Sequence, residues 1–147
     1  MRKLVLILLS ASALLSVAGC KSSPTAPDVK TFVGTWNATK AEFVSIANPT
    51  TKQDIVAGGS TLTLVLSTST FVFTITDPGQ APKVATGTWS ASSDTFTLTW
   101  STGFAGESQF DFVLDVDHLT LTGGHLPFDF TVGNFEEALL NLILVRQ

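Results

Sequence analysis

Few residues of this 147-residue chain have side chains that could do chemistry, and the densest group of them is acidic and histidine-containing. Asp115, Asp117 and His118 lie close together, and His125 and Asp129 follow further along. Carboxylate and imidazole groups could hold a divalent metal ion. However, Asp-Val-Asp-His is also ordinary chemistry for a tight hairpin, in which Asp accepts hydrogen bonds from backbone N–H groups. We favour the hairpin and expect neither a metal site nor a cofactor.

Serine and histidine could also form a hydrolase triad, but no motif places them for it. The sequence has no Gly-x-Ser-x-Gly nucleophile elbow and no glycine-rich phosphate loop, and no motif pairs two carboxylates. Cys20 is the single cysteine, so the chain cannot form an internal disulfide or a Cys-x-x-Cys site. We therefore expect the protein not to be an enzyme.

Cys20 ends an N-terminal segment typical of exported proteins. Two basic residues precede a 15-residue apolar stretch from Leu4 to Ala18, which is shorter than the about 20 residues of a membrane-spanning helix. The sequence Val17-Ala18-Gly19-Cys20 resembles the lipobox of bacterial lipoproteins. That resemblance implies a signal peptide of residues 1–19, cleavage before Cys20 and a diacylglyceryl group on its sulfur. The alternative is an ordinary secretory signal with a chance cysteine.

Acylation of Cys20 would make the lipid bilayer the first partner of the protein. In lipoproteins of many enteric bacteria an aspartate after the cysteine retains the protein at the inner membrane. Here Lys21 follows, so the resemblance implies sorting to the outer membrane where the source has two membranes. Residues 20–31 contain two prolines and read as a lipidated cysteine with a flexible tether. Without the signal, 6 basic and 12 acidic residues give a formal charge of −6, which argues against nucleic acid as a partner.

Residues 32–147 alternate apolar and polar side chains with a period of two, the pattern of antiparallel strands buried on one face. Thr occupies many outward positions, as in Phe96-Thr97-Leu98-Thr99-Trp100. The gaps are hairpin-sized and rich in turn residues. The pattern predicts one domain with strands that include residues 61–66, 71–76, 83–90, 94–101, 108–114, 118–122 and 126–132, with a turn at Gly123-Gly124 and an edge, a bend or a strand start at Pro127.

The two ends of this domain are less regular. The first strand, Phe32 to about Ile46, changes its inward parity between Ala38 and Ala41, which a β-bulge would explain. The C-terminal segment contains helix formers, but Leu142-Ile143-Leu144-Val145 is typical of a buried strand. We favour a strand and keep the helix as the alternative.

Two tripeptides carry a second resemblance. Gly34-Thr35-Trp36 opens the first strand, and Gly87-Thr88-Trp89 repeats it in the middle of the domain. Small lipocalin-type barrels begin with such a Gly-x-Trp, and an arginine from their last strand packs over that tryptophan. The resemblance implies that Trp36 closes one end of a barrel beneath Arg146. We therefore predict an all-β, lipocalin-like up-and-down barrel of about eight to ten strands, which also hides the strand edges of a meander. A two-sheet β-sandwich is the alternative.

Large aromatic residues occupy the inward positions of the predicted strands. In a hollow barrel they would line a pocket for a small hydrophobic ligand, and in a solid one they would form the core. These residues are Trp36, Phe71, Phe73, Trp89, Phe96, Trp100, Phe110 and Phe112. We expect a membrane-anchored lipoprotein that binds or carries a small hydrophobic ligand. The alternative is a structural lipoprotein with a filled barrel, whose outer surface meets an envelope protein.

Overall fold

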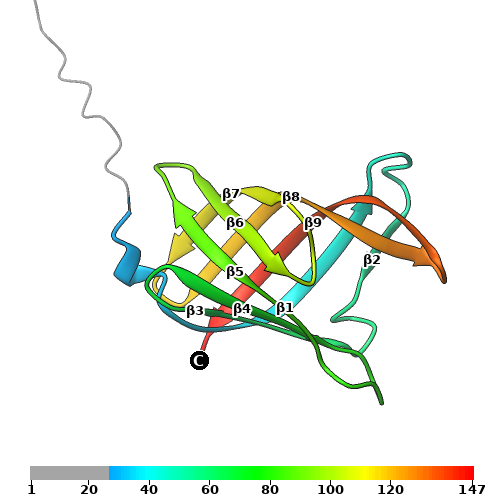
Figure 1. Cartoon of the computed structure of the whole chain (residues 1–147), viewed down its shortest axis with the longest axis horizontal. Coiled ribbons are helices and arrows are strands. Elements are labelled where there is room, and N and C mark those ends of the chain that lie inside the picture. Colours follow the sequence, from blue (N-terminus) through cyan, green and yellow to red (C-terminus); the bar gives the residue numbers. More distant parts are fainter. Residues whose placement is uncertain (1–26) are drawn as a thin grey trace, which may run out of the picture.

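The computed structural model describes residues 27–147, so Cys20 and the predicted signal peptide lie outside the described residues. A short 3₁₀ turn, η1 (Val29–Thr31), leads into nine antiparallel strands (Figure 1). The strands are β1 (Gly34–Ser45), β2 (Lys52–Asp54), β3 (Thr61–Leu66), β4 (Thr70–Thr76), β5 (Lys83–Ala91), β6 (Thr95–Thr102), β7 (Glu107–Asp115), β8 (His118–Thr131) and β9 (Asn134–Arg146). No helix within residues 27–147 is long and apolar enough to cross a membrane.

Eight of these strands close into a barrel. Hydrogen-bonded neighbours follow the chain order from β3 to β9, while β1 pairs with β3 on one side and with β9 on the other, which completes the ring. β2 joins only the end of β1, through pairs such as Phe43 with Gln53. The prediction of an all-β up-and-down barrel is confirmed. The sandwich alternative is wrong because all nine described strands belong to one sheet.

Each barrel strand turns alternate residues inward. In β3, Leu62, Leu64 and Leu66 are buried, whereas Thr61 is exposed and lies opposite Thr76 on the outer face. Burying a leucine side chain stabilises a fold by about 1.5–3 kcal/mol, and β-branched threonines suit the half-exposed outer surface. The inward-facing apolar residues of each strand therefore form the interior of the barrel.

The first strand and the C-terminal segment take the predicted forms. The register of β1 against β9 shifts between Ala38 and Lys40, which confirms the predicted bulge. The extra residue allows Trp36 and Ala41 both to point inward although their spacing is odd. The C-terminal residues form strand β9, so the helix alternative is wrong. Alternate leucines of β9 are fully buried, and this burial overrides the helix propensity of the segment.

The predicted turn at Gly123-Gly124 is wrong. β8 runs through this pair and joins the two strands expected at residues 118–122 and 126–132. The register against β9 shifts between Leu121 and Gly124, and Gly123 has a φ of 85°. The N–H of Gly123 donates to Oδ1 of Asn141 over 2.9 Å. The two glycines therefore form a bulge that bends the strand, a common use of glycine inside a strand.

Beyond this bulge, β8 and β9 leave the barrel as a long hairpin, residues 125–137 (Figure 1). The pairing of β7 with β8 ends at Thr122, so in the described chain this part of β8 is paired only with β9. Pro127 lies on this stretch, which has no strand partner on its β7 side, and of the three interpretations of this proline the pairing supports an edge. We refer to residues 125–137 as the β8–β9 hairpin.

Candidate functional site

One end of the barrel is sealed by aromatic rings. The ring centroid of Phe32 lies 5.4 Å from that of Trp89, 5.6 Å from that of Phe96 and 5.4 Å from that of Phe112. Trp89 and Phe96 stack with 5.4 Å between centroids and 19° between planes. Phe32, which precedes β1, thus lies across the end where β1 begins. These rings pack against one another inside this end of the barrel.

Arg146 covers the same end from outside. Its guanidinium carbon lies 4.3 Å from the ring centroid of Trp36. Nη1 donates to the carbonyl oxygen of Val33 over 2.7 Å, and Nη2 donates to the carbonyl oxygen of Thr31. The indole N–H of Trp36 donates to the carbonyl oxygen of Phe32 over 2.8 Å. The last strand, β9, thereby holds the segment that leads into the first strand, β1.

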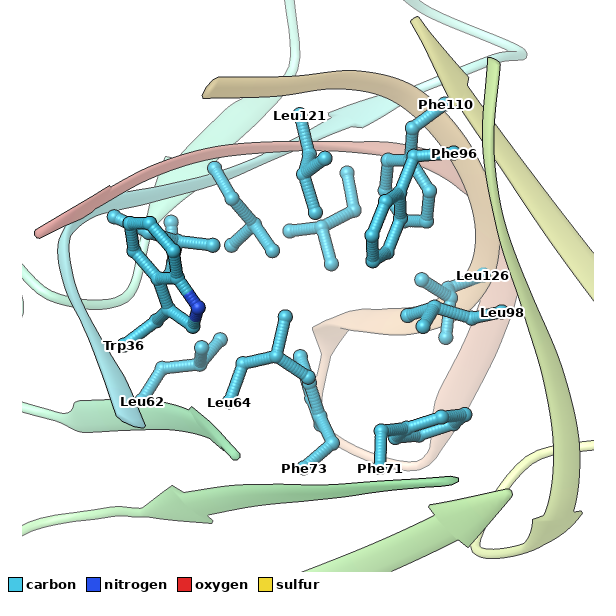
Figure 2. Packing of buried hydrophobic residues seen from close by; sticks show 14 of the residues in the cluster. Trp36, Leu62, Leu64, Phe71, Phe73, Phe96, Leu98, Phe110, Leu121 and Leu126 are labelled. Atoms are coloured by element: carbon cyan, nitrogen blue, oxygen red, sulfur yellow. The ribbon is translucent and has the colours of Figure 1, made fainter. Parts of the chain in front are cut away.

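The middle of the barrel is solid as well. Figure 2 shows Trp36, Leu64, Phe71, Leu98 and Leu121 pointing from different walls toward one another, and all five are buried. The rings of Phe71 and Phe73 meet the ring of Trp100 edge-on, at 5.0 and 5.5 Å between centroids. Such pairs contribute about 0.5–1.5 kcal/mol beyond their area burial.

Trp100 is held by a chain of two hydrogen bonds. Its indole N–H donates to Oγ of Ser108 over 2.9 Å, and that hydroxyl donates to the carbonyl oxygen of His125 over 2.6 Å. Ser108 is 1% exposed. The bond to His125 joins β7 to β8 beyond the last paired residues of their ladder. Ser108 is therefore a structural residue that fastens the base of the β8–β9 hairpin.

The opposite end of the barrel is open and contains a cavity of about 650 Å³. It is formed where β1 ends, between the β4–β5 and β6–β7 turns and the β8–β9 hairpin. Ligand pockets of about 300–1,000 Å³ lined mainly by apolar side chains are typical of small-molecule sites. The large apolar residues that line it are Phe43, Ile55, Phe73, Ile75, Phe104, Phe128 and Phe135.

The cavity walls come from segments far apart in the sequence. Phe43 of β1 stacks on Phe128 of the β8–β9 hairpin, with 3.9 Å between centroids and 15° between planes. Phe104, in the β6–β7 turn, packs edge-on against Trp100 at 4.8 Å and approaches Phe73 at 6.4 Å. The ring of Trp100 thus lies under the cavity, at the boundary between the solid core and the open end.

Three polar side chains in the cavity wall, those of Ser60, Asp77 and Lys83, form one cluster. Oδ1 of Asp77 accepts a hydrogen bond from Oγ of Ser60 over 2.8 Å, and Oδ2 forms an ion pair with Nζ of Lys83 at 2.9 Å. The hydrogen bond from Lys83, and next that from Ser60, lower the pKa of Asp77 below its usual value near 3.8. Gln53 and Asp129 also line the cavity. An apolar pocket with a few polar groups at its mouth results.

Of the eight aromatic residues predicted for a pocket or core, Phe73 alone lines this cavity. Trp36, Trp89, Phe96 and the half-buried Phe112 belong to the sealed end, and Phe71, Trp100 and Phe110 fill the middle. Alternation predicts that these side chains lie inside the barrel, but it does not distinguish the open end from the solid part.

Other cavity residues were missed. Phe104 lies in a turn, where alternation gives no signal, and Ile55 follows the short strand β2. Phe43 lies beyond the bulge, so its inward direction depends on that irregularity. Phe128 and Phe135 sit on the β8–β9 hairpin, whose course follows from the Gly123-Gly124 bulge. The aromatic spacing in β8, Phe128-x-Phe130, was the one available signal.

The acidic and histidine residues considered first do not form a cluster. Asp115 and His118 are cross-strand neighbours at the turn between β7 and β8, at the sealed end. His125 and Asp129 lie along the β8–β9 hairpin. Asp129 accepts hydrogen bonds from the backbone N–H groups of Gly133 and Asn134. Within residues 27–147, no group of three or more His, Cys, Asp or Glu is arranged to hold a metal ion.

Comparison of the chain with protein-family models and with curated proteins finds no match.

Proposed function

We propose that the protein is an exported bacterial lipoprotein, anchored through acylated Cys20, whose lipocalin-like barrel binds a small hydrophobic ligand. The observation that carries the binding proposal is the cavity of about 650 Å³ at the open end of the barrel. Its wall is formed largely by phenylalanine and isoleucine side chains, which gain from contact with apolar surface rather than with water.

The construction of the barrel supports the lipocalin resemblance. Gly34-Thr35-Trp36 begins β1, and the guanidinium of Arg146 from the last strand lies over the Trp36 ring. In that family the same two residue types close one end of the barrel. The cavity of this chain lies at the end opposite Trp36.

The anchoring proposal rests on sequence alone. The lipobox-like Val17-Ala18-Gly19-Cys20 follows an apolar stretch of signal-peptide length. Lys21 after the cysteine supports sorting to the outer membrane in a source with two membranes. Two or more acyl chains would hold the protein durably, since each buried methylene contributes about 0.8 kcal/mol.

Ligand binding can be tested with the full chain carrying Cys20→Ser, which removes the acylation site. Titration with a fluorescent fatty-alcohol probe should give saturable binding with a dissociation constant on the order of 1 μM, equivalent to about −8 kcal/mol. Ile75 lines the cavity from β4, directly opposite Lys83 of β5, so Ile75→Asp should weaken binding at least about tenfold by replacing apolar wall surface with a hydrated carboxylate.

Ile143 provides the matched control because it is the same residue type, in a strand, on the outer face of β9, and is 39% exposed. Ile143→Asp should leave probe affinity unchanged. Equal weakening by the two variants would show that the probe binds elsewhere. No saturable binding to the Cys20→Ser protein would end the carrier proposal.

If the probe does not bind, a structural role as an interaction lipoprotein becomes the better proposal. The exposed apolar residues of the β8–β9 hairpin favour it. Val132 at its tip is fully exposed and Phe135 is 71% exposed. Replacing both with Ser should then abolish crosslinking of the protein to an envelope partner. The same double variant should retain the fold, because neither side chain is buried.

A further inference from the structure

We infer that the cavity selects an uncharged lipid, such as a long-chain alcohol or ester, over the corresponding carboxylate. This inference rests on the proposed binding function and adds the chemical class of the ligand. It follows from the positions and the existing partners of the charged groups around the cavity mouth.

Lys83 is the one cation that lines the cavity among the described residues. Lys30 and Arg146 lie at the sealed end. Lys40 forms an ion pair with Glu42 at 3.0 Å. Lys52 pairs with Val44 and its neighbour Gln53 pairs with the inward-facing Phe43, so the alternation of β2 turns Lys52 to the outer face. Among the described residues, a carboxylate head group in the cavity could therefore form an ion pair only with Lys83.

Lys83 already forms an ion pair with Asp77. Its Nζ lies 2.9 Å from Oδ2 of Asp77, and the other carboxylate oxygen is held by the hydroxyl of Ser60. Ser60 is 9% exposed, so it fixes the carboxylate of Asp77 from a buried position. A ligand carboxylate that reached Lys83 would share the ammonium with Asp77 and would lie close to a second negative charge. Like charges a few ångströms apart oppose binding, and screening by salt weakens but does not reverse this effect.

Asp129 adds a further negative charge to the lining. Its carboxylate oxygens accept from the N–H groups of Gly133 at 2.8 Å and Asn134 at 3.4 Å. One lysine and two aspartates give the lining a formal charge of −1. A neutral head group avoids this field. A hydroxyl or ester oxygen can accept a hydrogen bond from the amide of Gln53, which also lines the cavity.

The test compares ligands that differ only in their head group. A long-chain fatty acid, the alcohol and the methyl ester of the same chain length compete with the fluorescent probe on the full-length Cys20→Ser protein near neutral pH. The alcohol and the ester should bind at least about tenfold more tightly than the carboxylate, the size expected for one unfavourable contact between like charges. Equal or tighter binding of the acid would overturn the inference.

Asp77→Asn is the diagnostic variant. It releases Lys83 from its ion pair, while the amide oxygen of the new side chain can still accept from Ser60. Affinity for the acid should rise about tenfold, and affinity for the ester should stay unchanged. Asp111→Asn is the matched control, because it removes the same charge from an exposed position of β7 that does not line the cavity. A shift no larger than that of Asp111→Asn would overturn the inference.

A second measurement needs no variant at the cavity. Lowering the pH toward about 4 protonates the carboxyl group of the ligand, so the affinities of acid and ester for the Cys20→Ser protein should converge. Affinities that stay apart at low pH would show that the difference does not come from the charge. The proposed function fails if the probe does not bind saturably; if the probe binds but acid and ester compete for it equally well, the inference alone fails.

Discussion

The guanidinium carbon of Arg146 lies 4.3 Å from the ring centroid of Trp36, in direct register with it across the β1–β9 seam of the barrel. The contact joins the second-last residue of the chain to the first strand. Trp36 is fully buried beneath it. Removal of the indole should therefore damage both the core and the closure of the barrel.

Trp36→Ala should cost about 3–5 kcal/mol of unfolding free energy, as large aromatic truncations in cores do. Denaturant titration of the Cys20→Ser protein would measure it. Val113→Ala, at a residue 68% exposed on β7, is the control and should change stability by less than about 0.5 kcal/mol. A loss below about 1 kcal/mol for Trp36→Ala would contradict the barrel register described above.

Gly124→Ala should destabilise the protein by about 1–3 kcal/mol, because a Cβ at this position would overlap the ring of the buried Phe110. The double variant with Phe110→Leu tests the cause. If the overlap is responsible, the added Ala should cost clearly less in the Phe110→Leu background than in the wild type. Strictly additive effects would mean that the clash is not the cause.

Acid should remove a contribution of Asp77 to stability. Its pKa is lowered in the folded protein, first by the hydrogen bond from Lys83 and then by that from Ser60. A lowered folded-state pKa stabilises the fold at pH values above the unfolded pKa, near 3.8, and this contribution is lost as the pH falls through the folded value. Between about pH 5 and pH 2, Asp77→Asn should therefore lose less stability than the wild type.

Lys83→Gln tests whether Lys83 is the cause of this pH dependence. Because Lys83 is the largest influence on Asp77, its replacement should reduce the acid-sensitive loss in a series of denaturant titrations. Adding Lys83→Gln to Asp77→Asn should then change the pH dependence no further. High salt should reduce the effect in the wild type, since both side chains reach solvent.

Membrane attachment should depend on Cys20, the single thiol of the chain. The exported Cys20→Ser protein should move from the membrane pellet to the soluble envelope fraction, as judged by immunoblotting. Ser22→Ala, a change of similar size two residues later, should remain in the pellet. Wild-type retention of Cys20→Ser would contradict acylation as the anchor.

Alternation identified most of the barrel because each strand has one buried face, as the leucines of β3 illustrate. It failed at Gly123-Gly124, where the local sequence is that of a turn. The need for glycine at position 124 comes from the ring of Phe110, which is distant in sequence, and the bulge is held by the contact of the Gly123 N–H with the amide of Asn141. Neither contact can be read from a period of two.

The cavity was harder to predict than the barrel. Whether an inward aromatic residue fills the core or lines the opening depends on its height along the barrel axis, and this height follows from the register of all eight strands. Phe71 and Phe73 are two residues apart in β4, yet only Phe73 lines the cavity. Phe104 comes from a turn, and its position is set by contact with Trp100.

The chain enters the barrel at the end that Arg146 seals, while the cavity faces the opposite way. Residues 21–30 can span on the order of 30 Å when fully extended, and β9 alone, with 13 residues, extends about 40 Å at a rise near 3.3 Å per residue. A domain held by Cys20 and standing upright would turn its mouth away from its own bilayer. Lipid exchange with that bilayer would require the domain to tip over, whereas exchange with a facing membrane or a soluble donor would not. If acylated Cys20 anchors the protein as proposed, the orientation of the barrel favours delivery of a bound lipid across the aqueous gap over extraction of lipid from the anchoring membrane.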